Sequence, residues 1–110
     1  MTDLTAYFSV QQSAILDLLR QMVTIESPSQ DAAAVNRVAD CVSAEMQSRG
    51  AQVERLPQKR GGDILVGRWP GGAEKPILLM CHMDTVWPIG TLATMPWREE
   101  DGLEFECQGD

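Results

Sequence analysis

Hydrophobic residues in the first part of the chain recur at the spacing of a helix. The residues at i, i+3, i+4, i+7 and i+8 of this face are Ile15, Leu18, Leu19, Met22 and Val23. Ser13 is a candidate N-terminal cap. Ser27-Pro28 is expected to end the helix, because the residue before a proline avoids the helical conformation.

A second helical stripe is expected from about Asp31 to Arg49. Its buried face consists of Val35, Val38, Ala39, Val42 and Met46. Ser29 or Asp31 can cap its first turn, and Gly50 suits the position just after its last turn, where a left-handed conformation is common.

Beyond Gly50 the pattern changes to short apolar runs bounded by turn residues. We expect strands over 52–56, 63–69 and 76–81, a loop over 87–97, and a short last strand over 103–107. The run Ile77-Leu78-Leu79-Met80-Cys81 is apolar on both faces of a pleat, which is typical of a strand at the centre of an α/β sheet. The predicted fold class is therefore α/β, with two helices packed on a partial mixed sheet.

Composition narrows the classes of function. Nine basic and sixteen acidic residues give a formal charge of −7, and the densest basic run is Lys59-Arg60, so neither nucleic acid nor an anionic membrane surface is an expected partner. No signal peptide or apolar stretch of membrane-spanning length is present. Cys41, Cys81 and Cys107 form no CxxC pair, which favours the reducing cytoplasm.

The candidate functional residues come directly after the most apolar run of the chain. His82, the single histidine, and Asp84 are two positions apart, so their side chains can share a face where this strand ends. The carboxylate could orient the imidazole for a divalent metal, the two could belong to a nucleophilic triad, or they could simply form a structural hydrogen bond. Spacing alone leaves these three interpretations open.

Other candidates have simpler interpretations. Cys81 and His82 are adjacent and would point to opposite faces of a strand, so we interpret the thiol as a small buried hydrophobe rather than a nucleophile. The acidic run Glu99-Glu100-Asp101, before Gly102, is interpreted as a solvated turn.

The run from Leu78 to Val86, followed by Gly90 and by Pro96-Trp97-Arg98, resembles the first metal motif of the co-catalytic zinc metallopeptidases and deacylases. That family includes glutamate carboxypeptidases, acetylornithine deacetylases, succinyl-diaminopimelate desuccinylases and aminoacylases, and the glutamate carboxypeptidase branch is the most similar. The resemblance extends over about residues 14–102 and includes Val23-Thr24-Ile25-Glu26-Ser27-Pro28.

The resemblance implies a hydrolase of amide or peptide bonds next to a free carboxylate. His82 would ligate one of two zinc ions, which cobalt can replace, and Asp84 would orient it as part of the catalytic machinery. A small peptide or an N-acyl amino acid would be the substrate, and a homodimer is compatible with full-length relatives. Residues 1–110 would be the incomplete N-terminal segment of a metallopeptidase catalytic domain with a zinc-exopeptidase-like fold.

The chain departs from the family pattern near its end. A Gly-Pro-Gly after the aromatic residue is missing, and Asp110 lies five residues past Phe105 where the family places a bridging Asp six residues past. The general-base glutamate and a second histidine normally lie further on. With one histidine, the chain alone is expected to be inactive. The alternatives are a non-catalytic degenerate fragment or small interaction protein without a metal site, and an unrelated α/β domain.

Overall fold

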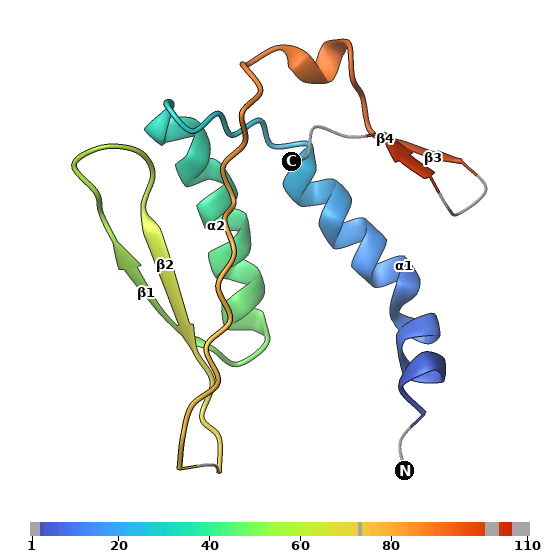
Figure 1. The fold of residues 1–110 in the computed structure, drawn as a ribbon, viewed down its shortest axis with the longest axis vertical. Helices are drawn as coiled ribbons and strands as arrows, with labels where there is room; N and C mark the ends of the chain where they lie inside the picture. Colours follow the sequence, from blue (N-terminus) through green and yellow to red (C-terminus); the bar gives the residue numbers. More distant parts are fainter. Residues whose placement is uncertain (1–2, 73, 101–103, 107–110) are drawn as a thin grey trace.

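The computed structural model describes residues 3–72, 74–100 and 104–106. In chain order, the elements are α1 (Leu4–Val23), α2 (Ala32–Ser48), β1 (Gln52–Leu56), β2 (Ile64–Arg68), the short 3-10 helix η1 (Thr91–Ala93), β3 (Arg98–Glu100) and β4 (Glu104–Glu106). Figure 1 shows α2 between the β1–β2 hairpin and α1, with a long extended segment leading from β2 to η1.

Helix α1 begins before the predicted cap at Ser13 and ends at Val23, the last residue of the hydrophobic pattern, rather than at Ser27-Pro28. Asp3, not Ser13, is its cap, and the Asp3 carboxylate accepts a hydrogen bond from the Ala6 amide at 3.1 Å. No proline or glycine interrupts the residues before Ser13, so the helix continues through them. At the other end, the Thr24 hydroxyl donates to the Arg20 carbonyl at 2.7 Å, and the helix stops at Val23, before Ser27-Pro28.

Helix α2 supplies the core and agrees closely with the prediction. The Asp31 carboxylate caps it by accepting from the Ala34 amide at 3.0 Å, and Gly50 follows it with a φ of 87°. The buried hydrophobic residues of the described chain are Ala34, Val35, Val38 and Ala39. The core is therefore a single face of one helix.

The β1–β2 hairpin covers that face. The two strands lie within the predicted segments 52–56 and 63–69. They pair antiparallel, and their register runs from Gln52 opposite Arg68 to Leu56 opposite Ile64. Arg55 joins the hairpin to α2, because its guanidinium donates to Asp63 at 2.6 Å and also binds Asp40. The backbone approaches α2 closely at Gly62, where an added Cβ would lie 2.6 Å from the Cβ of Val35.

The segment over 76–81 is extended but forms no strand, so the expectation of a buried central strand is wrong. Ile77, Leu78, Leu79 and Met80 are 90%, 79%, 89% and 85% exposed, and Cys81, expected to be buried, is also exposed. The two sheets of the described chain, β1–β2 and β3–β4, are both antiparallel and two-stranded, rather than parts of one mixed sheet. The physical reason is that a central strand needs two neighbours, and no described segment lies beside this one as a ladder partner.

The last described part of the chain is a small hairpin. The predicted strand over 103–107 is present as β4, and it pairs with β3, so that Glu99 lies in a strand rather than in the expected turn. The predicted loop over 87–97 contains η1. Cys107 and Asp110 lie outside the described residues.

The molecule is open rather than compact. Its radius of gyration is 16.0 Å, whereas a compact chain of this length is expected at about 13 Å. Its accessible surface is 8571 Å², against about 6,000 Å² for a folded protein of this mass. Among the described residues, no helix combines the length and the apolar character that crossing a bilayer requires.

Candidate functional site

The residues that follow the exposed apolar segment are held by the connection between α1 and α2. Pro28 and Thr85 form an isolated parallel bridge, in which the Thr85 amide donates to the Ser27 carbonyl at 2.8 Å and the Ser29 amide donates to the Thr85 carbonyl at 3.0 Å. The backbone is therefore held by hydrogen bonds at Thr85, whereas the extended segment before His82 has no such support from the described residues.

Two serine hydroxyls strengthen this junction. The Ser27 side chain, in a residue that is 2% exposed, donates to the Met83 carbonyl at 3.1 Å. The Ser29 hydroxyl lies 3.1 Å from the Thr85 carbonyl. The Ser27 hydroxyl on the Met83 carbonyl and the Ser29 amide on the Thr85 carbonyl fix the backbone on both sides of Asp84.

His82 and Asp84 lie against each other, as their spacing suggests. The His82 Nδ1 is 2.9 Å from the Asp84 backbone carbonyl oxygen and 3.2 Å from the Asp84 Oδ1. Both partners can only accept, so Nδ1 must carry the proton. The lone pair of the neutral ring is then on Nε2, which is the form that binds a metal through Nε2.

The carboxylate of Asp84 is kept ionised by its surroundings. A hydrogen bond from the Ser29 hydroxyl is the main cause that lowers the pKa of Asp84 below its ordinary value of 3.8, and partial burial opposes this shift. The Asp84 backbone and His82 lower the pKa further. The side chains of His82 and Asp84 are 66% and 39% exposed, so the pair faces solvent.

Glu26 fixes the loop that follows the His82–Asp84 pair. Its Oε1 accepts hydrogen bonds from the amide of Gly90, the residue before η1, at 2.8 Å and from the Leu92 amide within η1 at 3.0 Å. A carboxylate at the start of a helical turn is favoured by both the hydrogen bonds and the local dipole. One short connection between α1 and α2 thus supports the backbone on both sides of the site.

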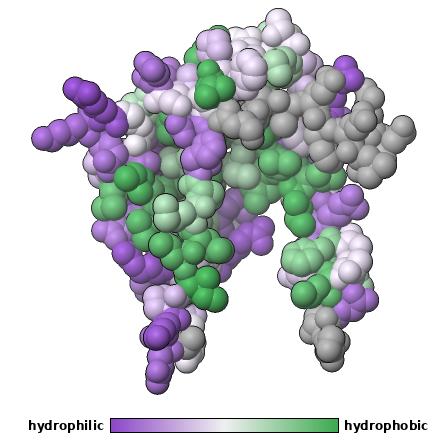
Figure 2. All heavy atoms as spheres, in the orientation of Figure 1, coloured by the Kyte–Doolittle hydropathy of each residue, from purple (hydrophilic) through white to green (hydrophobic). Residues whose placement is uncertain are grey.

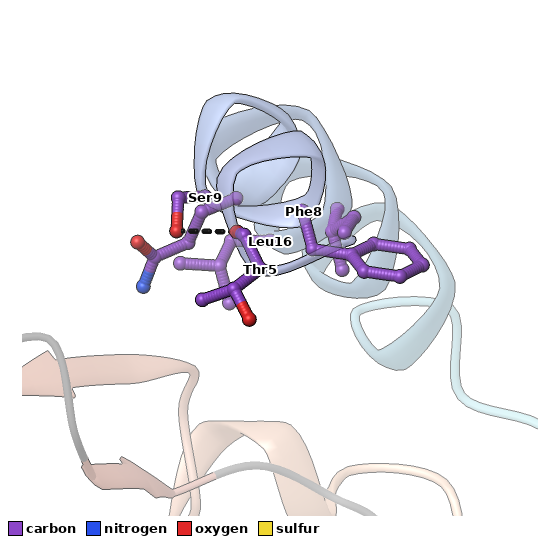
Figure 3. A pocket seen from close by; sticks show the side chains of 6 residues that line it. Thr5, Phe8, Ser9 and Leu16 are labelled. Carbon is purple, nitrogen blue, oxygen red and sulfur yellow. Dashed lines mark hydrogen bonds between the residues drawn. The ribbon is translucent and has the colours of Figure 1, made fainter. Parts of the chain in front are cut away.

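A shallow hollow lies beside this junction, with a volume of about 590 Å³, and it is lined by residues of both segments: Pro28, Ser29, Gln30, Asp31, Thr85, Val86, Pro88 and Ile89. The Thr85 Oγ1 is buried and has no hydrogen-bond partner in the described part of the chain, and the same is true of the Trp87 Nε1. A second hollow, of about 370 Å³, runs along the exposed side of α1 near Phe8 and Leu16 and contains no ionisable group (Figure 3).

The described residues do not by themselves form a metal site. Among them, no group of three or more His, Cys, Asp or Glu side chains is placed to hold an ion. Cys81 is exposed and adjacent to His82, and Asp110, the other candidate ligand, lies outside the described residues.

The sequence analysis identified the His82–Asp84 pair but not its supports. Glu26, Ser27 and Ser29 contact residues that are 56 to 66 positions away along the chain. Their local signal is the polar run Glu-Ser-Pro-Ser between two helices, and this run does not indicate which distant segment it binds.

Comparison with known proteins gives one informative similarity. No protein-family model matches the chain. A peptidase has a related sequence. Carboxypeptidase G2 of Pseudomonas sp. (strain RS-16) is 37% identical over 93 residues, which cover 82% of this chain and 22% of that protein.

The similarity includes the candidate site but spans only about a fifth of the length of that relative. A stretch that covers 82% of a chain of 110 residues includes His82 and Asp84 wherever it begins. The chain is therefore similar, over the segment that carries the His82–Asp84 pair, to part of a carboxypeptidase.

Proposed function

We propose that this chain supplies the first metal-binding segment of a zinc-dependent hydrolase of the carboxypeptidase or deacylase type. In this role His82 ligates zinc through Nε2, and Asp84 fixes its tautomer and raises its basicity. The observation that carries the proposal is the contact of His82 Nδ1 with two acceptors of Asp84, within a segment that is 37% identical to carboxypeptidase G2.

The same similarity supports a proposal for the substrate class. We propose a small peptide or an N-acyl amino acid, cleaved at the amide bond beside its free carboxylate. Because the described residues offer no cluster of three donors, the remaining zinc ligands and the general base would come from other parts of the protein that carries this segment. The chain alone is then expected to be inactive, and it contributes a positioned ligand rather than a complete centre.

A chimera of the two related proteins tests this proposal. The matched segment of carboxypeptidase G2 is replaced by the corresponding residues of this chain, and release of a C-terminal amino acid is measured together with zinc content. We expect a zinc-loaded, active chimera, in which His82→Ala reduces zinc content and loses at least about 1,000-fold in kcat/KM.

Two further variants separate orientation from folding. Asp84→Asn in the chimera should lower kcat/KM by about 10- to 100-fold while leaving the fold intact. Asp17→Asn, which changes an exposed carboxylate of α1 that pairs with Arg20 on the helix surface, is the matched control and should have no effect. A folded chimera whose activity and zinc content are insensitive to His82→Ala would contradict the proposal.

The second candidate function is a non-catalytic interaction protein without a metal site. It is favoured by one observation, the near-complete exposure of Ile77, Leu79 and Met80. The chimera distinguishes the two, because a segment that has lost its metal-binding role would give a folded protein without activity.

A further inference from the structure

One buried hydroxyl contacts the residue that separates His82 from Asp84. Ser27 is 2% exposed and is the one buried polar residue among those that the structure describes. Its hydroxyl donates to the carbonyl oxygen of Met83 at 3.1 Å. Burying a hydroxyl costs free energy unless it finds a hydrogen-bond partner, and the Met83 carbonyl is that partner. The burial of Ser27 is thus tied to the backbone of the candidate site.

The backbone of Ser27 holds the other side of Asp84. The Ser27 carbonyl accepts a hydrogen bond from the Thr85 amide at 2.8 Å. The Met83 carbonyl and the Thr85 amide belong to the two peptide groups that flank the Cα of Asp84. Because peptide groups are planar, fixing both of them sets the φ and ψ of Asp84. A single residue of the connection between α1 and α2 therefore determines the conformation of Asp84.

The conformation of Asp84 in turn decides where the acceptors of His82 lie. The Asp84 carbonyl oxygen belongs to one of the two fixed peptide groups and is 2.9 Å from the His82 Nδ1. The Asp84 Oδ1 is 3.2 Å from the same nitrogen. Rotation of either peptide group would move these acceptors relative to the ring, so the direction of the ring depends on the contacts of Ser27.

The chain before His82 provides no comparable support. Residues 77–80 make no hydrogen bond to a described residue, and their side chains are 79% to 90% exposed. Figure 2 shows hydrophobic surface where this extended segment crosses the molecule in Figure 1. The backbone contacts that hold the His82–Asp84 pair therefore come from the residues that follow His82.

We infer that Ser27 is a positioning residue, which orients the His82 imidazole through the two peptide groups on either side of Asp84. This orientation is a property of the chain itself, whereas its value for holding zinc rests on the proposed function. Ser29 acts one peptide group further on, because its amide donates to the Thr85 carbonyl at 3.0 Å.

Nitrogen-detected NMR of the chain at pH 8 tests the inference through its single histidine. In Ser27→Ala the Met83 carbonyl loses its donor, so one peptide group beside Asp84 is released. The ratio of the Nδ1–H to the Nε2–H tautomer should fall about 2- to 10-fold, the effect of losing one ordinary hydrogen bond. Ser27→Thr keeps the hydroxyl and should restore the ratio of the parent. A folded Ser27→Ala variant with the parent's ratio would overturn the inference.

Two controls separate positioning from a general loss of structure. Ser9→Ala removes a hydroxyl that donates to the Thr5 carbonyl at 2.8 Å on the exposed surface of α1, and it should leave the ratio unchanged. Val38→Ala opens a cavity in the core of α2, at a residue that is 3% exposed, and should lower the free energy of unfolding without changing the ratio of the folded chain. If Val38→Ala shifts the ratio as much as Ser27→Ala, the effect is general loosening and the inference is wrong.

Ser27→Cys keeps the test decisive if Ser27→Ala does not fold. A thiol is only slightly larger than a hydroxyl and is a weak donor, so a folded Ser27→Cys variant should also show a reduced ratio. The parent's ratio in this variant would overturn the inference.

These spectra require neither zinc nor activity, so their outcome is independent of the chimera. A reduced ratio in Ser27→Ala, together with a folded chimera insensitive to His82→Ala, would support the positioning role and contradict the proposed zinc site. An unchanged ratio in folded Ser27→Ala, together with a chimera that His82→Ala inactivates, would overturn the positioning role alone.

Discussion

At the scale of single residues, the site depends on a hydrogen bond that selects one form of one ring. His82 is the single histidine of the chain, and its Nδ1 lies 2.9 Å from the Asp84 carbonyl oxygen and 3.2 Å from the Asp84 carboxylate. A ring held by two acceptors cannot rotate without losing both, so its tautomer and direction are set together.

The tautomer gives the first prediction. Nitrogen-detected NMR of the parent at pH 8 should show His82 mainly as the Nδ1–H tautomer, the opposite of the preference of free histidine. In Asp84→Ala, which keeps the backbone carbonyl but removes the carboxylate, the Nε2–H population should rise. Because the chain has one histidine, the imidazole signals need no assignment. An unchanged tautomer ratio would show that the backbone carbonyl alone orients the ring.

The carboxylate also makes the stability depend on pH. The pKa of Asp84 in the folded chain lies below its ordinary value of 3.8, mainly because of the Ser29 hydroxyl. A carboxyl group whose pKa is lowered by folding stabilises the folded state fully at any pH above its pKa in the unfolded chain. This contribution disappears as the pH falls through its pKa in the folded chain. Urea unfolding should show the parent more stable than Asp84→Asn at pH 6, with the difference shrinking below about pH 4. A difference that grew on acidification would contradict this sign.

At the scale of elements, α2 and the β1–β2 hairpin form the part of the fold that closes on itself. Gly62 is the point of closest approach, because an added Cβ there would lie 2.6 Å from the Cβ of Val35, which is 5% exposed. Gly62→Ala should destabilise the chain by about 1–3 kcal/mol through overpacking. Gly71→Ala is the control, since a Cβ at Gly71 meets nothing within 4 Å. Equal urea midpoints for the two variants would show that α2 and the hairpin are not in close contact.

The connection between α1 and α2 is predicted to control the loop after the site. Glu26→Ala removes the acceptor for the Gly90 and Leu92 amides, which lie 2.8 Å and 3.0 Å from its Oε1. Loss of an ionised acceptor costs about 1–2 kcal/mol at a partly exposed position. Hydrogen exchange of these two amides should therefore accelerate about 5- to 30-fold, while Glu26→Gln, which keeps a carbonyl oxygen, should show a smaller effect. Exchange unchanged in Glu26→Ala would show that η1 holds without this cap.

The elements that were predicted correctly are those with local causes. The cap at Asp31, the turn at Gly50 and the alternation in β1 and β2 are all readable within a few residues. Residues 76–81 were predicted as a strand because their composition fits one, but a strand exists only when another segment pairs with it, and hydrophobicity does not identify that partner. The supports of the site were missed for the same reason, since Glu26 and Ser27 act on residues far along the chain.

At the scale of the whole molecule, the described chain is an open fold with a small core. Its core is one face of α2, its radius of gyration is 16.0 Å, and its most apolar backbone is uncovered. The site contains one histidine oriented by Asp84, and the described residues form no group of three metal ligands around it. Under the proposed function, the polypeptide that supplies the remaining zinc ligands would also be expected to lie against the exposed residues 77–80.

Zinc binding by the chain alone tests this last point. The described residues contain one histidine oriented as a ligand and no cluster of three donors, whereas catalytic zinc sites use about three protein ligands. Calorimetry at pH 7.5 under reducing conditions should therefore show no stoichiometric zinc binding tighter than about micromolar. The variants Cys81→Ser and His82→Ala show whether any weak zinc binding depends on either of these side chains. Sub-micromolar binding of one zinc per chain that His82→Ala abolishes would show that the chain completes a metal centre by itself, and the requirement for further ligands would be wrong.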